Sequence, residues 1–81
     1  MEEQGRLGRT IRELRKNRKL NQTELAEKAD VSLMTISRVE RGEHDPHLRT
    51  LKRIADGLGV RLSDLMRSAG YFEDEDGRVE K

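Results

Sequence analysis

The stretch from residue 21 to residue 42, NQTELAEKADVSLMTISRVERG, constrains the fold of this chain more than any other. Asn21 and Ser32 are of the residue types that cap helix N-termini, and apolar residues at helical spacing follow each of them. These apolar positions are Leu25, Ala26 and Ala29 in the first segment, and Ile36 and Val39 in the second. Two helices this short cannot bury their apolar faces against each other alone, so the stretch requires further helices around it.

A tight turn is predicted between these two helices. Residues 29–31 form it, and Val31 is apolar because it fills the gap between the helices. Asn21 and Glu24 have the spacing of a capping box, and Gly42 suits the left-handed position that ends the second helix. Two helices joined in this way form a helix-turn-helix, whose second helix is presented to the major groove of DNA.

A helix before this motif is predicted over about residues 6–18. Leu7, Ile11 and Leu14 recur at i, i+4 and i+7, which marks one helix face. Gly8 lowers the helix propensity within this segment, so we expect a closely packed neighbour at that position.

Two helices after the motif are predicted, over residues 48–58 and about residues 62–67, and Pro46 belongs to the loop before them. The residues expected on the apolar side of the first of these helices are Leu48, Leu51, Ile54, Ala55 and Leu58. Nothing in the chain predicts a strand. We therefore expect an all-α, compact five-helix domain over residues 1–72 and a disordered acidic tail over residues 73–81.

The composition excludes several classes of protein. The chain has 81 residues, which make one small domain, and it has no cysteine for a disulfide or a thiolate metal site. No apolar run approaches the roughly 18 residues that span a bilayer, and the polar N-terminus does not resemble a signal peptide. We therefore expect a cytoplasmic protein with no membrane partner.

The net charge of +1 hides an uneven distribution. Residues 73–81 hold five acids and two bases, a net charge of −3, which leaves +4 on residues 1–72. The basic residues gather near the N-terminus, at Arg6, Arg9, Arg12, Arg15, Lys16, Arg18 and Lys19. A basic folded part favours a polyanionic partner, although a solvated helix face has the same pattern.

The candidates for reading DNA bases are the outward positions of the third helix: Ser32, Leu33, Met34, Ser37 and Arg38. The Arg38 guanidinium can donate to O6 and N7 of guanine, and the serine hydroxyls can bond a base edge or a phosphate. Leu33 and Met34 have no hydrogen-bonding group but can contact thymine methyl groups. The alternative is that either of these apolar side chains folds back into the core.

The candidates for binding DNA phosphates are Arg15, Asn21, Gln22, Thr23, Arg41, His47 and Arg49. Residues 21–23 begin a helix, where free N–H groups and the positive end of the helix dipole favour an anion. Gln22 would fix the docking register through the DNA backbone. The alternatives are that Asn21 is only a cap and that Arg41, His47 and Arg49 bind nothing.

Arg15 and Glu40 are also predicted to form a structural ion pair. Arg15 follows Leu14 on the first helix, and Glu40 follows Val39 on the third. If these helices pack together, the two charged side chains meet at the edge of the core. Removal of one partner then leaves a buried charge unpaired.

Catalysis and metal binding find little support in the sequence. His44 and His47 are the only histidines, whereas zinc needs three or four ligands in a defined geometry. The chain has no glycine-rich phosphate loop and no nucleophile beside a histidine base. We therefore expect no enzyme activity, no cofactor and no metal.

Several segments resemble the phage-repressor and Cro family of helix-turn-helix proteins (XRE-like). They are residues 14–15, 20–26, 31–32, 36–42 and 54–60 with Pro46 and Leu65, and the match covers about residues 5–67. The resemblance implies a compact, lambda-repressor-like domain of five helices that binds operator DNA as a symmetric dimer. It also implies that Gln22 contacts the DNA backbone and that Arg15 pairs with Glu40. The positions that the family uses for DNA contact correspond to Ser32, Leu33, Met34 and Arg38.

Three features depart from the family pattern. Leu33 and Met34 stand where polar or basic residues are usual, so base readout there differs from the pattern. Arg61 replaces the small hydroxyl residue that usually caps the fifth helix. Tyr71 and Phe72, the only aromatic residues, lie beyond the common core, where they pack on the fifth helix, form a dimer contact or stay exposed.

The sequence therefore predicts a sequence-specific transcriptional regulator, a repressor, that binds double-stranded DNA in the nucleoid as a homodimer. Its third helix would enter the operator major groove, with half-sites about 34 Å apart. The alternative is a protein-interaction module on the same fold, an antitoxin or a bridging adaptor with a toxin or regulatory protein as its partner. A third interpretation is the targeting domain of a longer protein or a restriction-system controller.

Overall fold

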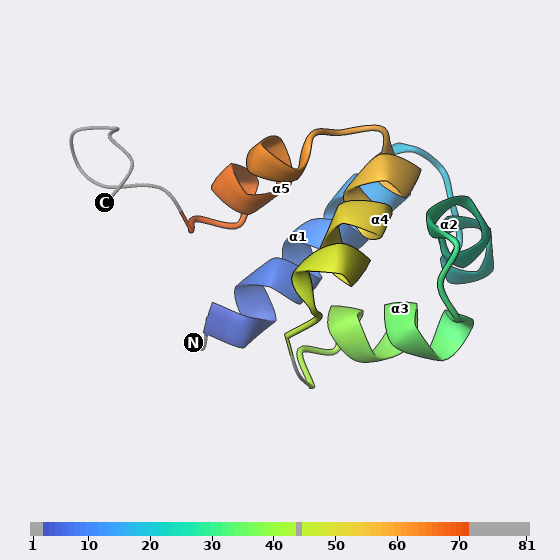
Figure 1. Cartoon of the computed structure of the whole chain (residues 1–81), viewed down its shortest axis with the longest axis horizontal. Coiled ribbons are helices and arrows are strands. Elements are labelled where there is room, and N and C mark those ends of the chain that lie inside the picture. Colours follow the sequence, from blue (N-terminus) through green and yellow to red (C-terminus); the bar gives the residue numbers. More distant parts are fainter. Residues whose placement is uncertain (1–2, 44, 72–81) are drawn as a thin grey trace.

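Five helices and the turns between them make up residues 3–43 and 45–71, the part of the chain that the computed structural model describes (Figure 1). The helices are α1 (Glu3–Asn17), α2 (Gln22–Ala29), α3 (Leu33–Glu40), α4 (Leu48–Leu58) and α5 (Leu62–Ser68). These residues contain no strand, so the all-α prediction is confirmed. The predicted disorder of residues 73–81 and the domain boundary at residue 72 lie outside the described residues.

The helix bounds follow the sequence signals closely except at the start of α1. This helix begins at Glu3 rather than near Arg6, because no proline or capping residue between them stops it. α4 covers residues 48–58 as predicted, and α3 begins directly after its cap, Ser32.

Side-chain caps fix the start of both helices of the helix-turn-helix. The Glu24 backbone N–H donates to Asn21 Oδ1 over 2.8 Å, and the Asn21 backbone N–H donates to Glu24 Oε1 over 2.8 Å, which completes the capping box. Ser32 Oγ accepts from the Thr35 backbone N–H over 3.0 Å. Asp30, between the helices, has a left-handed φ of 59°, a conformation that aspartate tolerates better than most residues.

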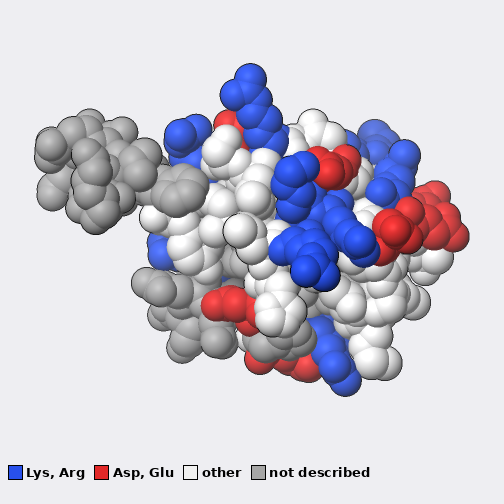
Figure 2. Space-filling model, in the orientation of Figure 1, with Lys and Arg blue, Asp and Glu red and all other residues white. Residues whose placement is uncertain are grey.

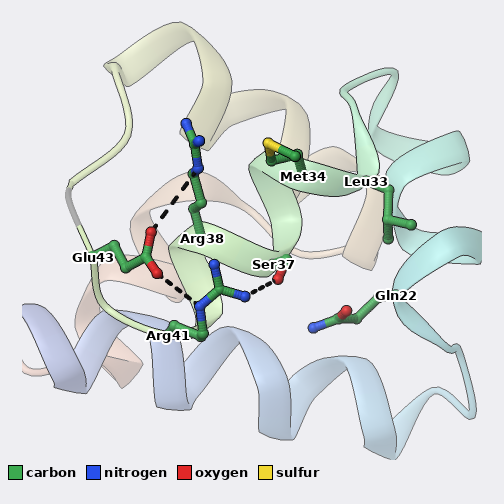
Figure 3. Close-up of a pocket in the computed structure, with 7 residues that line it drawn as sticks. All are labelled: Gln22, Leu33, Met34, Ser37, Arg38, Arg41 and Glu43. Carbon is green, nitrogen blue, oxygen red and sulfur yellow. Dashed lines mark hydrogen bonds and ion pairs between the residues drawn. The ribbon is translucent and has the colours of Figure 1, made fainter.

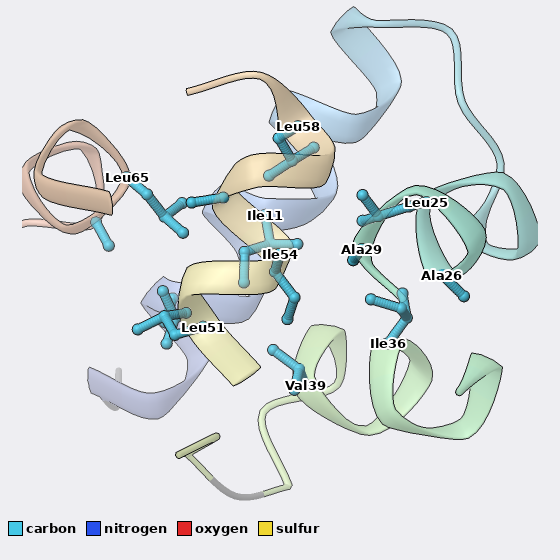
Figure 4. Close-up of a cluster of buried hydrophobic side chains, with 13 residues drawn as sticks. Ile11, Leu25, Ala26, Ala29, Ile36, Val39, Leu51, Ile54, Leu58 and Leu65 are labelled. Carbon is cyan, nitrogen blue, oxygen red and sulfur yellow. The ribbon is translucent and has the colours of Figure 1, made fainter. Parts of the chain in front are cut away.

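The hydrophobic core takes side chains from all five helices (Figure 4). The largest fully buried side chains are Ile11 of α1, Leu25 of α2, Ile36 and Val39 of α3, Ile54 and Leu58 of α4, and Leu65 of α5. α2 packs against both α3 and α4, and α3 also packs against α1. The two short helices of the motif thus bury their apolar faces against further helices, as their length requires.

The buried apolar face of α4 is shorter than predicted, because it does not include the first residue of the helix. Leu51, Ile54, Ala55 and Leu58 are buried, but Leu48 is 69 % exposed. The prediction for Leu48 was wrong because this residue begins the helix, one turn before Leu51, where α4 enters the core.

Gly8 allows α1 and α3 to approach each other closely. A Cβ atom at this position would lie 2.7 Å from the backbone oxygen of Glu40 and closer still to that of Val39. Because no side chain fits there without a shift of the backbone, the expectation of a closely packed neighbour at Gly8 is confirmed. The contact holds the C-terminal end of α3 against α1.

Candidate nucleic-acid interface

α3 has one buried face and one exposed face. Ile36 and Val39 are buried and hold the helix in the core. Leu33 is 47 % exposed and Met34 is 59 % exposed, so neither folds back into the core. The Arg38 side chain is 51 % exposed on the same outer face. In Figure 1, α3 forms the lower edge of the molecule, with its outer side uncovered by any other described helix.

An open groove follows this exposed face. Its lining residues are Gln22 of α2, Leu33, Met34, Ser37 and Arg38 of α3, and Arg41 and Glu43 after α3. Figure 3 shows Leu33 and Met34 toward the N-terminal end of α3, and Arg38, Arg41 and Glu43 toward its C-terminal end. Apolar and cationic groups therefore share one surface of one helix.

Glu43 pairs with both arginines of this groove. Its Oε2 accepts a hydrogen bond from Arg41 Nε over 2.8 Å, and its Oε1 lies 3.9 Å from Arg38 Nε (Figure 3). Arg41 also donates to the Ser37 hydroxyl. The side chains of Arg38, Arg41 and Glu43 are each about half exposed, so water screens these ion pairs and they contribute little to stability.

A third arginine–glutamate pair lies on the inner side of the same helix. Arg15 donates from Nε to Glu40 Oε2 over 2.7 Å and from Nη2 to Glu40 Oε1 over 3.0 Å. Arg15 Nη1 donates to the Leu20 backbone oxygen over 2.9 Å, and Gln22 Nε2 donates to Glu40 Oε1 over 3.0 Å. This network ties α1 and the start of α2 to the end of α3.

The hydrogen bonds to Glu40 raise the pKa of the Arg15 guanidinium above its ordinary value, although burial acts in the opposite direction. Because the folded-state pKa is raised, the stabilisation is present at neutral pH and is lost only as the pH rises through that raised value. Arg15 is only 8 % exposed, and Glu40 and Leu20 occupy three of its N–H groups. These contacts show Arg15 in the ion pair, and phosphate binding by Arg15 stays a prediction, since this residue also lines an open hollow with Gln22 and Arg41.

The start of α2 lies beside the groove. Asn21 and Thr23 are exposed there, and Asn21 also acts as the helix cap. Gln22 is half-buried, and its amide reaches Glu40 at the edge of the groove. The amide nitrogen of Gln22 carries a second N–H, so the contact with Glu40 fixes its position without using all of its donors.

The last two candidate phosphate ligands lie elsewhere. His47 and Arg49 are exposed at the start of α4, where they line a separate hollow with Leu48 and Thr50. His47 occupies the N-cap position but makes no side-chain capping bond. The structure therefore does not bring these two residues into the groove of α3.

Positive charge is not confined to α3. Figure 2 shows Lys and Arg side chains gathered over α4, which carries the exposed Arg49, Lys52 and Arg53. Acidic side chains lie among them, and Lys52 Nζ lies 3.3 Å from Asp56 Oδ2. Charge alone therefore does not identify a DNA-binding surface, whereas the exposed groove of α3 combines charge with groups that can read bases.

Three predicted features beyond the groove have different outcomes. Arg61 stands at the N-cap of α5 without a side-chain capping bond, and Tyr71 packs against the core while Phe72 lies outside the described residues.

In residues 3–43 and 45–71 no group of three or more His, Cys, Asp or Glu could hold a metal, and His44 is not described. No helix in this part of the chain is long and apolar enough to cross a membrane.

The sequence analysis missed Glu43. The sequence does hold a signal for its contact with the arginines: a glycine and then an acidic residue follow directly after a helix end that carries Arg38 and Arg41. Gly42 has a left-handed φ of 73°, and the Glu43 backbone N–H donates to the Arg38 backbone oxygen over 3.1 Å. This reversal of the chain brings the Glu43 carboxylate back to the arginines of the last turn.

Comparison with solved structures shows relatives among regulators. The chain is 28% identical to the clp gene regulator ClgR from C. glutamicum, with a TM-score of 0.76 and coverage of 85% of this chain and 90% of that chain. It is 27% identical to the restriction-modification controller protein C.AhdI from Aeromonas hydrophila, with a TM-score of 0.74 and coverage of 76% and 94%. An HTH_3 family transcriptional regulator from Vibrio cholerae is 31% identical with a TM-score of 0.74, covering 79% of this chain but 36% of the longer protein.

No curated protein matches the sequence. The model of the HTH_3 helix-turn-helix family, however, matches residues 11–65, which is more than half of the chain. The match includes the helix-turn-helix and most of the core described above. The chain therefore belongs to the HTH_3 (XRE-type) helix-turn-helix family of DNA-binding regulators.

Proposed function

We propose that this protein is a sequence-specific transcriptional regulator, a repressor, whose α3 enters the major groove of an operator. The exposed groove of α3 supports this proposal most directly. It presents Leu33, Met34, Ser37 and Arg38 on a helix whose opposite face is fixed in the core. A rigid helix with reading groups on its free face is what major-groove recognition requires.

The residues of this face differ in what they can read. Arg38 would donate two hydrogen bonds to O6 and N7 of a guanine, a contact worth about 1–3 kcal/mol of discrimination. Ser32 and Ser37 would bond a base edge or a phosphate. Leu33 and Met34 would contact thymine methyl groups, so we expect thymines beside the guanine in the preferred sequence.

The phosphate contacts would come from both ends of the groove. Asn21, Gln22 and Thr23 place the N-terminus of α2 at one end, where backbone N–H groups favour an anion. Arg41 lies at the other end of the groove, and we expect His47 and Arg49 to bind DNA phosphates further along the duplex. Such contacts position the protein on the duplex without reading its sequence.

A homodimer completes the proposal. The reading surface of one copy is a single short helix, and one such helix contacts too few bases for high specificity. Two copies related by a two-fold axis would read half-sites about 34 Å apart, one turn of DNA. The proposed role is binding without catalysis, and the operator would be palindromic.

Selection from a randomised duplex library, followed by sequencing and by titration of the winning duplex at several salt concentrations, tests this proposal. We expect a palindrome to be enriched, with the logarithm of the binding constant falling steeply against the logarithm of salt concentration. Binding that depends steeply on salt but enriches no sequence would contradict sequence-specific recognition.

The exposure of Leu33 and Met34 also favours a second candidate function. Two adjacent apolar side chains on an open surface suit a protein partner, as in an antitoxin or a bridging adaptor. In that case the toxin or regulatory protein would cover the groove of α3. Absence of DNA binding at low salt in the same titration would favour this function over the first.

A further inference from the structure

Arg38 and Arg41 of the α3 groove both pair with the Glu43 carboxylate, and each faces it with its Nε atom. Arg41 Nε donates to Glu43 Oε2 over 2.8 Å, and Arg38 Nε lies 3.9 Å from Glu43 Oε1. We infer that Glu43 is a positioning residue for base recognition, which pairs with both arginines at Nε and leaves the terminal amino groups of Arg38 for the DNA. This inference rests on the proposed function, because it concerns how the same surface selects its sequence.

The geometry leaves the reading edge of Arg38 free. Figure 3 shows its two terminal nitrogens pointing away from Glu43, while Nε faces the carboxylate. Recognition of guanine needs two N–H donors in a fixed arrangement, and the terminal pair provides them. Arg41 is held at a second point as well, by its bond to the Ser37 hydroxyl.

Glu43 can act in this way because its own position is fixed. Its backbone N–H donates to the Arg38 backbone oxygen over 3.1 Å, and the left-handed Gly42 sets the direction of the chain. The carboxylate therefore stands beside the last turn of α3 rather than on a free loop. A half-exposed arginine without such a partner samples many rotamers, and ordering it on binding costs affinity.

The same carboxylate has a second effect on DNA binding. It places a negative charge at the edge of the surface that approaches the phosphates, which weakens binding to every sequence. Orientation of Arg38, in contrast, strengthens binding only where a guanine is present. Glu43 therefore lowers non-specific affinity and raises guanine discrimination, and removing it should change the two quantities in opposite directions.

The exposure of the network predicts that its removal spares the fold. The side chains of Arg38, Arg41 and Glu43 are all about half exposed, so a substitution at Glu43 leaves no buried charge unpaired. We therefore expect Glu43→Gln to melt at nearly the wild-type temperature, and its DNA binding to be measurable on a folded protein.

The test uses fluorescence anisotropy with three duplexes: the selected operator, the operator with adenine in place of the guanine assigned to Arg38, and a scrambled duplex. For Glu43→Gln we expect guanine-over-adenine discrimination to fall about three- to tenfold, the range given by the ordering cost of one long side chain. Affinity for the scrambled duplex should rise roughly twofold, because one repelling charge is removed. Glu27→Gln removes the same charge from the exposed side of α2, outside the groove, and should leave the discrimination unchanged.

Two further variants separate the two effects of Glu43. Glu43→Asp keeps the charge but shortens the reach, so discrimination should fall while affinity for the scrambled duplex stays at the wild-type value. In an Arg38→Ala background, Glu43→Gln should no longer alter discrimination. If wild-type protein discriminates between the duplexes and Glu43→Gln discriminates equally well, the inference is overturned and the proposed function stands. If wild-type protein itself discriminates between none of them, the proposed function fails first.

Discussion

The two closest arginine–glutamate pairs at the end of α3 differ in burial rather than in length. Arg15 and Glu40 approach to 2.7 Å on the inner side, where their side chains are 10 % and 4 % exposed. Arg41 and Glu43 approach to 2.8 Å on the outer side, where their side chains are 55 % and 46 % exposed. The two pairs are nearly equal in distance but contribute differently to stability, because burial decides how strongly water screens each pair.

The inner pair, Arg15 with Glu40, has a structural role. It fixes the distance and rotation of α3 relative to α1, and through Gln22 it also fixes the start of α2. On the outer side, Glu43 pairs with both Arg41 and Arg38 but leaves these arginines accessible to another partner. One helix thus carries a structural pair on one face and, in our proposal, a recognition network on the other.

Breaking the inner pair should have the largest effect. Arg15→Met or Glu40→Met leaves one charge buried without its partner, and we expect each to lower the free energy of unfolding by about 3–5 kcal/mol in urea denaturation. The double variant should lose much less than the sum of the two, because no charge is then stranded. Additive losses would contradict the coupling, and Arg41→Met serves as the exposed control with little effect.

Changing the distance between α1 and α3 should have the next largest effect. Gly8→Ala places a Cβ against the backbone oxygens of Val39 and Glu40, and we expect thermal unfolding to show a loss of about 1–3 kcal/mol or more. Gly5→Ala is the matched control in the same helix, since a Cβ there meets nothing within 4 Å. This control should gain up to about 1 kcal/mol from helix propensity. Equal stability of the two variants would contradict the close approach at Gly8.

Substitution of the exposed apolar pair should have the smallest effect on stability. For Leu33→Ser and Met34→Ser we expect the free energy of unfolding to change by less than about 0.5 kcal/mol, because both side chains are exposed. Operator affinity should fall by about 0.8 kcal/mol for each methyl-sized contact that is lost. Unchanged affinity for the operator would favour the protein-partner function for these two residues.

Features that follow from residue types at helical spacing, within one helix or between two helices that pack together, could be predicted from the sequence. The bounds of α4 and the caps of α2 and α3 follow from residue types at fixed spacing. The pairing of Arg15 with Glu40 followed from two helical faces that had to meet, and the structure shows this pair.

Features that depend on how far a helix enters the core could not be predicted. The pattern placed Leu48 on the apolar side of α4, but the part of the helix that enters the core begins only at Leu51. Glu43 was missed because its contact with the arginines depends on the left-handed turn at Gly42 rather than on helical spacing.

The central claim is that the exposed face of α3 reads DNA sequence, and the most direct test compares Arg38→Ala with Lys52→Ala. Both variants remove one exposed positive charge, but Lys52 lies on α4, away from the groove. Dissociation constants would be measured for the selected operator and for a scrambled duplex.

We predict that Arg38→Ala loses about 1–3 kcal/mol on the operator and much less on the scrambled duplex, so that selectivity falls. Lys52→Ala should shift both constants slightly and alike, leaving selectivity at the wild-type value. Equal losses on the two duplexes for Arg38→Ala, with selectivity unchanged, would contradict base reading by α3.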